Sequence, residues 1–211
     1  CWTSLRLVLN TPNTGSIAGR VATSEGKSVG SVVVSLDANL AEFPKAVTTP
    51  ANGTYTFPAL FENLAYEVEA NKGGSYSEGV STLDLVLIQR HILGVQAITD
   101  PYKLIAADAN NDRNVTASDL TELRKLILGV STSFTNESWR FPVAGTTVNV
   151  SPISFEEVSA TVNGTNNNFV AVKIGDVNGN VTTNINNPSV EGRSNSNVAM
   201  TVADAAVAAG E

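Results

Sequence analysis

Histidine and cysteine are almost absent from this chain of 211 residues, which has one of each, His91 and Cys1. A single cysteine can form neither an internal disulfide nor a cysteine-based zinc site. Any mechanism that pairs a nucleophile with a histidine base would depend on His91 alone. Most hydrolase mechanisms are disfavoured on these grounds, and we predict no catalytic residues and no enzymatic activity.

Basic and aromatic residues are also scarce. Lys and Arg total 13 against 20 for Asp and Glu, the net charge is -7, and aromatic residues make up 6% of the chain. No basic run is interleaved with aromatic residues, as it is in proteins that bind nucleic acids. No apolar run approaches the ~20 residues that a membrane-spanning helix needs. We therefore expect no nucleic-acid partner and no membrane span.

Asparagine is abundant, with 22 residues against 6 lysines. Six of these asparagines begin Asn-x-Ser/Thr triplets, which accept glycans in a secretory context but also arise as ordinary polar turns. The chain opens at Cys1 without a leader, which indicates a mature form or a trimmed fragment. We predict an extracellular or cell-surface protein, with glycans as one partner class. The candidate glycosylation residues are Asn52, Asn136, Asn149 and Asn163.

Residues 15–71 show the alternation of short strands separated by turns. About five strands in this segment predict a small β-sandwich. The stretches 15–21, 32–36 and 52–57 (GSIAGRV, VVVSL and NGTYTF) resemble the carboxypeptidase-regulatory-like domain, a transthyretin-type sandwich of secreted bacterial proteins. The resemblance implies a spacer or binding module without catalysis.

An internal repeat follows, because residues 80–95 recur as residues 115–130 with seven of sixteen positions identical. Apolar residues at Leu85, Ile88 and Ile92, and at Leu120, Leu123 and Ile127, follow the i, i+3, i+7 spacing of a helix. Each copy begins at Ser or Thr with Asp three residues later and ends at Gly, which predicts two capped helices. His91 aligns with Leu126 of the other copy, which favours a core or flanking role.

Residues 108–119 have the oxygen-bearing side chains of a calcium loop. Ca²⁺ takes six to eight oxygens, which a 12-residue loop supplies from positions 1, 3, 5, 7, 9 and 12. The alternative, an acidic turn followed by a helix cap, would explain Thr116 and Asp119 but not the oxygen donors at positions 1, 3 and 5. Position 6 holds Arg113 where such loops have Gly, and a non-Gly residue at positive φ costs about 1–2 kcal/mol. The predicted ligands are Asp108, Asn110, Asp112, the Asn114 carbonyl, Thr116 and Asp119.

With Asp at position 12 and two loop–helix repeats that end in Ile-Leu-Gly, residues 73–130 resemble a type I dockerin. This resemblance implies Ca²⁺ as the cofactor and a cohesin domain as the partner. Recognition in dockerins rests on loop positions 10 and 11. Those positions hold Thr82 and Leu83 in one copy and Ala117 and Ser118 in the other, which do not match.

The first loop of the repeat lacks its first half and keeps only Ser81 and Asp84 as oxygen donors. Asp176, Asn178 and Asn180 match the missing half, and Pro188 falls where a helix would otherwise begin. We therefore predict a second, split calcium site from Asp84, Ser81, Asp176, Asn178 and Asn180. The alternative is an ordinary turn at residues 176–179.

The predicted fold is mainly β with a small α part, in which an N-terminal sandwich precedes a dockerin-like domain with an added β segment. The expected divisions are a strand and linker (1–14), the sandwich (15–71), the dockerin-like domain (72–181), and a linker and strand (182–211).

Three functional hypotheses follow. The first is a calcium-stabilised structural subunit of a surface fibre or adhesin, which polymerises head to tail through strands at 2–9 and 198–202. The second is a dockerin that anchors a secreted carbohydrate-active complex to a cohesin. The third is a carbohydrate-processing enzyme, but its one adjacent acidic pair, Glu156 and Glu157, would point to opposite faces of a strand.

Overall fold

A computed structural model describes residues 13–62, 64–161 and 167–184. The predicted terminal strands at 2–9 and 198–202 and the candidate glycosylation residue Asn163 lie outside the described residues.

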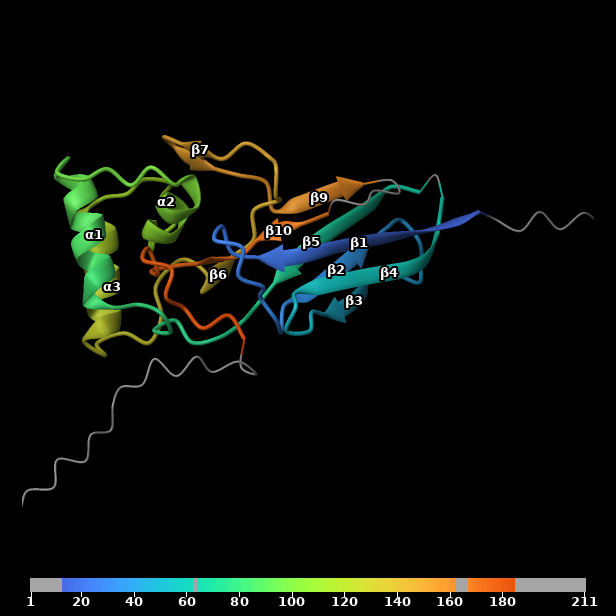
Figure 1. Ribbon diagram of the computed structural model, residues 1–211, viewed down its shortest axis with the longest axis horizontal. Coiled ribbons are helices and arrows are strands. Elements are labelled where there is room, and N and C mark those ends of the chain that lie inside the picture. The colour runs from blue at the N-terminus through green and yellow to red at the C-terminus, as the bar shows by residue number, and fades with distance from the viewer. Residues whose placement is uncertain (1–12, 63, 162–166, 185–211) are drawn as a thin grey trace, which may run out of the picture.

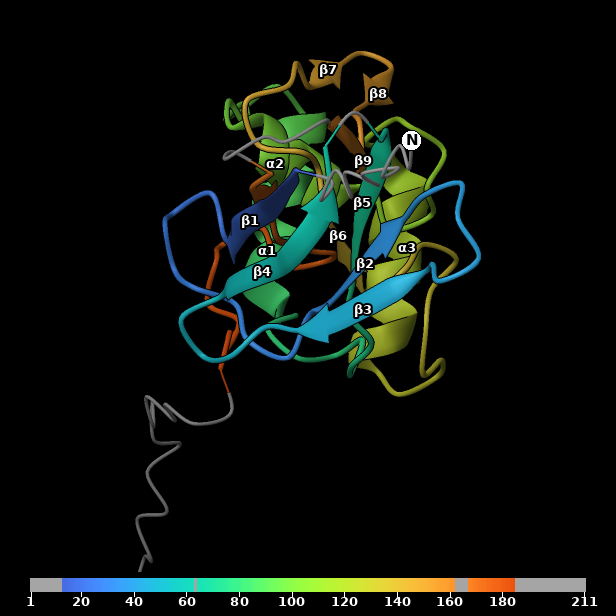
Figure 2. The ribbon, with the colours of Figure 1, turned by 90° about the vertical axis from the view of Figure 1, so that its right-hand side faces the viewer.

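Five strands follow one another in the N-terminal part, as the alternation predicts. They are β1 (Thr14–Ala22), β2 (Val33–Asp37), β3 (Lys45–Thr48), β4 (Thr54–Phe61) and β5 (Tyr66–Asn71). Figure 2 shows them in front of the helices. Alternate residues of two sheets, such as Ile17 of β1 and Leu36 of β2, are buried in one core. The prediction of a small sandwich at this point of the chain is confirmed, whereas its assignment to the transthyretin type stays a prediction.

Three helices gather at the other end of the molecule (Figure 1). They are α1 (Thr82–Ile92), α2 (Pro101–Ala107) and α3 (Ala117–Ile127). The helices α1 and α3 are the two predicted from the repeat, and both begin with a capping box, at Ser81 and Thr116. The pattern did not reveal α2, although Asp100 caps its first turn and Pro101 occupies its first position.

The helical core differs in part from the predicted spacing. Ile88, Leu120 and Leu123 are buried as expected, but Ile92 is 37% exposed because α1 ends there. Ile127 is only half-buried, and its neighbour Leu126 takes its place in the core. His91 has a structural role, since its Nδ1 accepts the backbone N–H of Ile98 in the loop after α1.

In the part of the chain after α3 that the structure describes there are six short strands, which confirms the predicted added β segment. They are β6 (Trp139–Arg140), β7 (Asn149–Val150), β8 (Ile153–Ser154), β9 (Val158–Thr161), β10 (Phe169–Val170) and β11 (Val172–Lys173). Two of them extend the sandwich, giving sheets ordered β10-β1-β4 and β3-β2-β5-β9. Because β9 pairs with β5 and β10 with the end of β1, this segment is built into the sandwich.

The stretch 169–174 serves both cores at once. Phe169 and Ala171 are buried in the sandwich core, whereas Val172 and Ile174 are buried in the helical core. A strand points successive side chains to opposite faces, and here each face has a different core to fill. Figure 1 shows this stretch, in orange, running between the strands and the helices. The two cores therefore share one stretch of backbone.

We predict that the two cores unfold together. The change Ile174→Ala removes a fully buried side chain from the helical core and should cost about 2–5 kcal/mol. In a Trp2→Phe background, fluorescence reports Trp139 of the sandwich core, and circular dichroism at 222 nm reports the helices. Both signals should shift to the same lower midpoint in urea. A shift of the circular dichroism midpoint without a shift of the fluorescence midpoint of Trp139 would contradict a shared core. Val150→Ala, at an exposed position, is the control.

Candidate metal centre

Three carboxylates meet in the loop between α2 and α3. One oxygen from each of Asp108, Asp112 and Asp119 lies within 4.8 Å of the others. Asp119 is fully buried and Asp108 is 3% exposed, while Asp112 is exposed to solvent. The cluster is thus closed on the protein side and open on the side of Asp112.

Backbone N–H groups hold these carboxylates in place. Asp108 accepts N–H groups from Asp112 and Arg113 at 3.1 and 2.9 Å. Asp119 accepts those of Asn110 and Thr116 at 3.1 and 2.8 Å. The first and last ligand positions of the predicted loop are therefore bound to its middle, and the loop is closed on itself.

The turn predicted at position 6 is present. Arg113 has a φ of 70°, and Asn111 has a φ of 59°. Both residues are in the left-handed region, which Asn adopts readily but which costs about 1–2 kcal/mol for a residue such as Arg113. The loop keeps the shape of a calcium loop despite lacking the glycine.

The other predicted ligands of this loop lie around the same cluster. The amide Oδ1 of Asn110 accepts the N–H of Asp112 at 3.0 Å, and Asp112 in turn accepts the N–H of Asn114 at 2.9 Å. The hydroxyl of Thr116 caps α3 by accepting the N–H of Ser118. All six predicted residues are therefore brought together in one loop.

The two halves of the predicted split site also meet. Asp84, which is fully buried at the start of α1, accepts the N–H groups of Val177 and Asn178 with one oxygen, at 2.9 and 3.0 Å. Its other oxygen accepts the N–H and the hydroxyl of Ser81. The bonds from Val177 and Asn178 to Asp84 join residues more than 90 positions apart in the chain.

Asp176 occupies the place that Asp108 has in the continuous loop. It accepts N–H groups from Asn180 at 3.1 Å and from Val181 at 2.8 Å, the residues at positions 5 and 6 of its half-loop. Asn178 accepts the N–H of Asn180, as Asn110 does for Asp112. Asp84 binds positions 3 and 9, as Asp119 does. The split loop thus repeats the hydrogen-bond pattern of the continuous one.

Burial and mutual proximity make Asp108, Asp119 and Asp176 hard to ionise. Burial, together with the nearby Asp119 and Asp112, raises the pKa of Asp108 to about 6. Burial likewise raises the pKa of Asp119, with Asp112 adding to it, and that of Asp176, with Asp84 adding to it. A divalent cation would relieve this repulsion, and the donors are carboxylate, amide and backbone oxygens, which suit a hard cation.

The amide Nδ2 of Asn178 is buried and has no hydrogen-bond partner in the described part of the chain. The split loop therefore contains one polar atom that the protein does not satisfy. The continuous loop, which has three carboxylates to the two of the split loop, is the more strongly acidic of the two.

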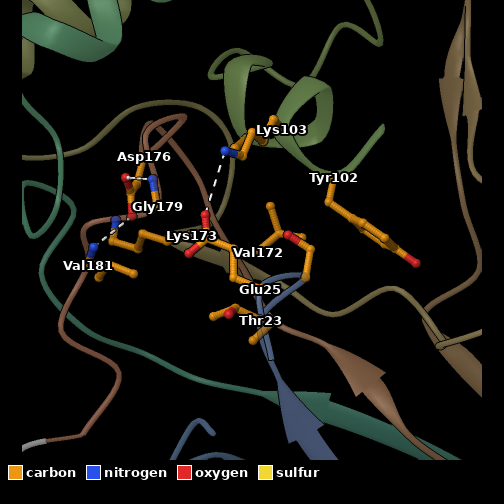
Figure 3. A pocket seen from close by; sticks show the side chains of 12 residues that line it. Thr23, Glu25, Tyr102, Lys103, Val172, Lys173, Asp176, Gly179 and Val181 are labelled. Atoms are coloured by element: carbon orange, nitrogen blue, oxygen red, sulfur yellow. Dashed lines mark hydrogen bonds and ion pairs between the residues drawn. The ribbon is translucent and has the colours of Figure 1, made fainter. Parts of the chain in front are cut away.

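The split loop lies against the sandwich and α2, as Figure 3 shows. Lys27, in the turn after β1, donates to the carbonyl of Gly179 at 2.6 Å, and Glu25 lies 3.6 Å from Lys103 of α2. Lys173 is 3% exposed and donates to the carbonyl of Tyr76, and burial lowers its pKa to about 8. A second loop of the protein is thus built where the two cores meet.

The candidate glycosylation residues differ in accessibility. Asn52 and Asn149 are exposed. Asn136 is 4% exposed, and its Nδ2, the atom to which a glycan would be attached, donates to the carbonyl of Asp108 at 2.8 Å. In the folded protein Asn136 is therefore a structural residue, which corrects its reading as a glycan acceptor.

An exposed apolar stripe runs along α1, on the side away from the helical core. The sequence pattern singled out Leu83 alone among its members. The equivalent positions of α3 hold the polar residues Ser118 and Thr121. Where the chain leaves each helix, the equivalent positions are apolar and exposed in both copies. The α1 stripe is made of Leu83 and Val86 on the helix and of Leu93 and Val95 directly after it, and the residues after α3 are Leu128 and Val130.

Comparison with known proteins identifies part of this region. Residues 77–128 match the model of the dockerin type I domain. No curated protein matches the chain. Among solved structures, a C-terminal fragment of the pilus adhesin SpaC from Lactobacillus rhamnosus GG matches 29% of this chain and 24% of its own, with 13% identity and a TM-score of 0.26. A likeness this weak carries no argument.

Residues 77–128 are therefore similar to a dockerin type I domain, and domains of this type are non-catalytic, bind Ca²⁺ in general and are typically extracellular. The match ends at α3 and does not include residues 176–180, which complete the first loop. Among the described residues no helix is long and apolar enough to cross a membrane.

We predict that acid stabilises the metal-free protein. The pKa values of Asp108, Asp119 and Asp176 are raised above that of an unfolded chain, about 3.9. The native state then binds more protons than the unfolded state between about pH 4 and 6, so stability rises as the pH falls. The melting temperature of dialysed protein should increase from pH 7 to pH 5.

With saturating Ca²⁺ the trend should reverse, because protons compete with the ion for the same carboxylates. A metal-free melting temperature that falls steadily from pH 7 to pH 5 would contradict the prediction.

Proposed function

We propose that the chain is a non-catalytic, calcium-stabilised structural module of an extracellular or cell-surface assembly. The single observation that carries this proposal is the split loop, in which Asp84 and residues 176–180 repeat the hydrogen-bond pattern of the loop at 108–119. A loop restored from two distant segments joins the end of the described chain to the start of the dockerin repeat.

Two ions would be held in this proposal. The first takes oxygens from residues 108–119, and the second from the split loop, where Asp84 supplies position 12. Ca²⁺ suits both, since it accepts six to eight oxygens in flexible geometry. The proposed ligands are Asp108, Asn110, Asp112, Asn114, Thr116 and Asp119 for the first ion, and Asp84, Ser81, Asp176, Asn178 and Asn180 for the second.

The ions would act by stabilising the fold. An ion that binds only the native state contributes about 2.7 kcal/mol when its concentration is a hundred times its dissociation constant. At the split loop this free energy would also hold residues 176–181 against the turn at 23–27, through Lys27 and Gly179. The ion would thus fasten the helices to the sandwich.

We predict that calorimetric titration of metal-free protein gives two bound Ca²⁺ per chain. Asp119→Asn and Asp84→Asn each keep the shape and one acceptor of the carboxylate but remove its charge. Each variant should lose one of the two binding events and lose part of the rise in melting temperature that Ca²⁺ produces. Glu122→Gln, at a surface carboxylate of α3, should bind as the wild type does.

An Asp84→Asn variant that still binds two ions would contradict the split site. Wild-type protein whose melting temperature is the same with Ca²⁺ and with chelator would contradict the proposed function as a whole.

Docking to a cohesin is the second candidate function, and the exposed apolar stripe on α1 favours it. Contiguous apolar side chains on a surface mark sites of protein association. Leu83 and Val86 lie on one face of α1, Leu93 follows directly after the helix, and the equivalent positions of the α3 copy lack two of these apolar residues. The asymmetry favours one binding mode, through α1.

We predict that Val86→Lys abolishes binding to a cohesin that recognises the wild-type chain, because it places a charge in the centre of the stripe. Thr121→Lys, at the equivalent position of α3, is the matched control and should bind normally. Surface plasmon resonance against a panel of immobilised cohesins measures both. Equal loss in the two variants would show that α1 is not the docking helix.

Assembly into a filament by strand addition, with glycans on exposed Asn residues, is a finer form of the structural proposal. In the described part of the chain, β10 pairs with β1 only at Val21 and Ala22, which leaves most of one edge of β1 without a strand. Such an edge can accept a strand from another subunit. Size-exclusion chromatography tests this idea, and a stable monomer at high concentration would contradict it.

A further inference from the structure

The continuous calcium loop is held from outside by residues that follow α3 and lie beyond the dockerin match. Asn136 donates its backbone N–H to the carbonyl of Ala109 at 3.1 Å and its side-chain amide to the carbonyl of Asp108 at 2.8 Å. It is 4% exposed, so water competes little for these bonds. Positions 1 and 2 of the loop are thus both fastened to one residue.

Arg140 holds the same loop at a second place. Its Nη1 donates to the Oδ1 atoms of Asn136 and Asn111, at 3.1 and 3.2 Å. Asn111 is position 4 of the loop and has a positive φ. Arg140 therefore both orients Asn136 and holds the turn at Asn111.

The guanidinium of Arg140 is itself fixed by Glu157. Its Nε and Nη2 donate to the two carboxylate oxygens of Glu157 at 2.8 and 2.6 Å, a bidentate pair. Glu157 also accepts the N–H of Phe141 and immediately precedes β9, which pairs with β5 of the sandwich. The loop is thereby connected to the sandwich through two side chains.

A third bond reaches the position where the loop lacks glycine. The N–H of Ile153, in β8, donates to the carbonyl of Arg113 at 2.8 Å. Both residues with positive φ in this loop, Asn111 and Arg113, thus accept a hydrogen bond from the segment after α3. These bonds offset the strain that the absent glycine would otherwise relieve.

We propose that Asn136 and Arg140 are positioning residues for the calcium site at 108–119. They hold the loop in its closed shape before an ion arrives, which raises affinity by removing conformations that cannot bind. Because linkage is reciprocal, an ion in the loop strengthens the contact of Arg140 with Glu157 and hence the packing of β9. This inference rests on the proposed function, since it requires the loop to bind Ca²⁺.

The split loop provides an internal control. Among the described residues, the sandwich contacts the split loop through Lys27, which donates to the carbonyl of Gly179. In the same part of the chain no hydrogen bond connects Asn136 or Arg140 to the proposed ligands of the split loop. Loss of either positioning residue should therefore weaken one calcium site and leave the other unchanged. A general loss of stability would weaken both.

The experiment is calorimetric titration of the full chain with Ca²⁺ in two backgrounds. Asp84→Asn leaves the 108–119 site, and Asp119→Asn leaves the split site. In the first background Asn136→Ala and Arg140→Ala should each raise the dissociation constant about 5- to 10-fold, the effect of one lost buried hydrogen bond. In the second background the same two substitutions should leave the dissociation constant of the split site unchanged. Asn149→Ala, at an exposed Asn of the same segment, is the matched control.

Arg140→Lys keeps the charge and much of the packing but loses the fork that binds Glu157 and Asn136 together. It should weaken the 108–119 site to a similar extent, and it provides a folded variant if Arg140→Ala does not fold. Equal weakening at both sites, or an unchanged 108–119 site in the folded variants, would overturn the inference while leaving the proposed function intact. Wild-type protein that binds no Ca²⁺ would instead overturn the proposed function.

Discussion

The carboxylate of Asp84 is the group on which the arrangement of this protein depends. It is fully buried, and it accepts backbone N–H groups from Val177 and Asn178, far away in the chain, and from Ser81 beside it. A buried carboxylate must be hydrogen-bonded or neutralised, and the first half of the ordinary loop is missing here. Ser81 satisfies one oxygen of Asp84, and the return of the chain at residues 176–180 satisfies the other. The path from α3 back to α1 is therefore a requirement of the first loop.

That return explains why the molecule cannot be divided at the boundary of the dockerin match. To reach Asp84, the chain passes between the helices and the sandwich, where Phe169 and Ala171 face one core and Val172 and Ile174 face the other. The two halves thus share the stretch 169–174 and the split loop, and they are also joined by the hydrogen bond from Lys27 to Gly179. Stabilisation gained in one half is therefore available to the other.

The parts that could be predicted from the sequence are those with a local cause. The two repeat helices have caps and glycine ends within a few residues, and the loop at 108–119 contains its own ligand positions, so each was recognisable. The contact of Asp84 with the half-loop at 176–180 was predictable because each half-loop lacks what the other has. Ile92 was misplaced because periodicity does not show that α1 ends there. The roles of Asn136 and Arg140 depend on long-range contacts, which no spacing reveals.

The most direct test of this account is a crystal structure of the protein grown with Ca²⁺, with the anomalous signal of the ion measured. The account predicts two peaks, one of them within about 2.3–2.6 Å of oxygens of both Asp84 and Asp176. A peak in the loop at 108–119 alone, with Asp84 and Asp176 bound only to backbone N–H groups, would contradict it.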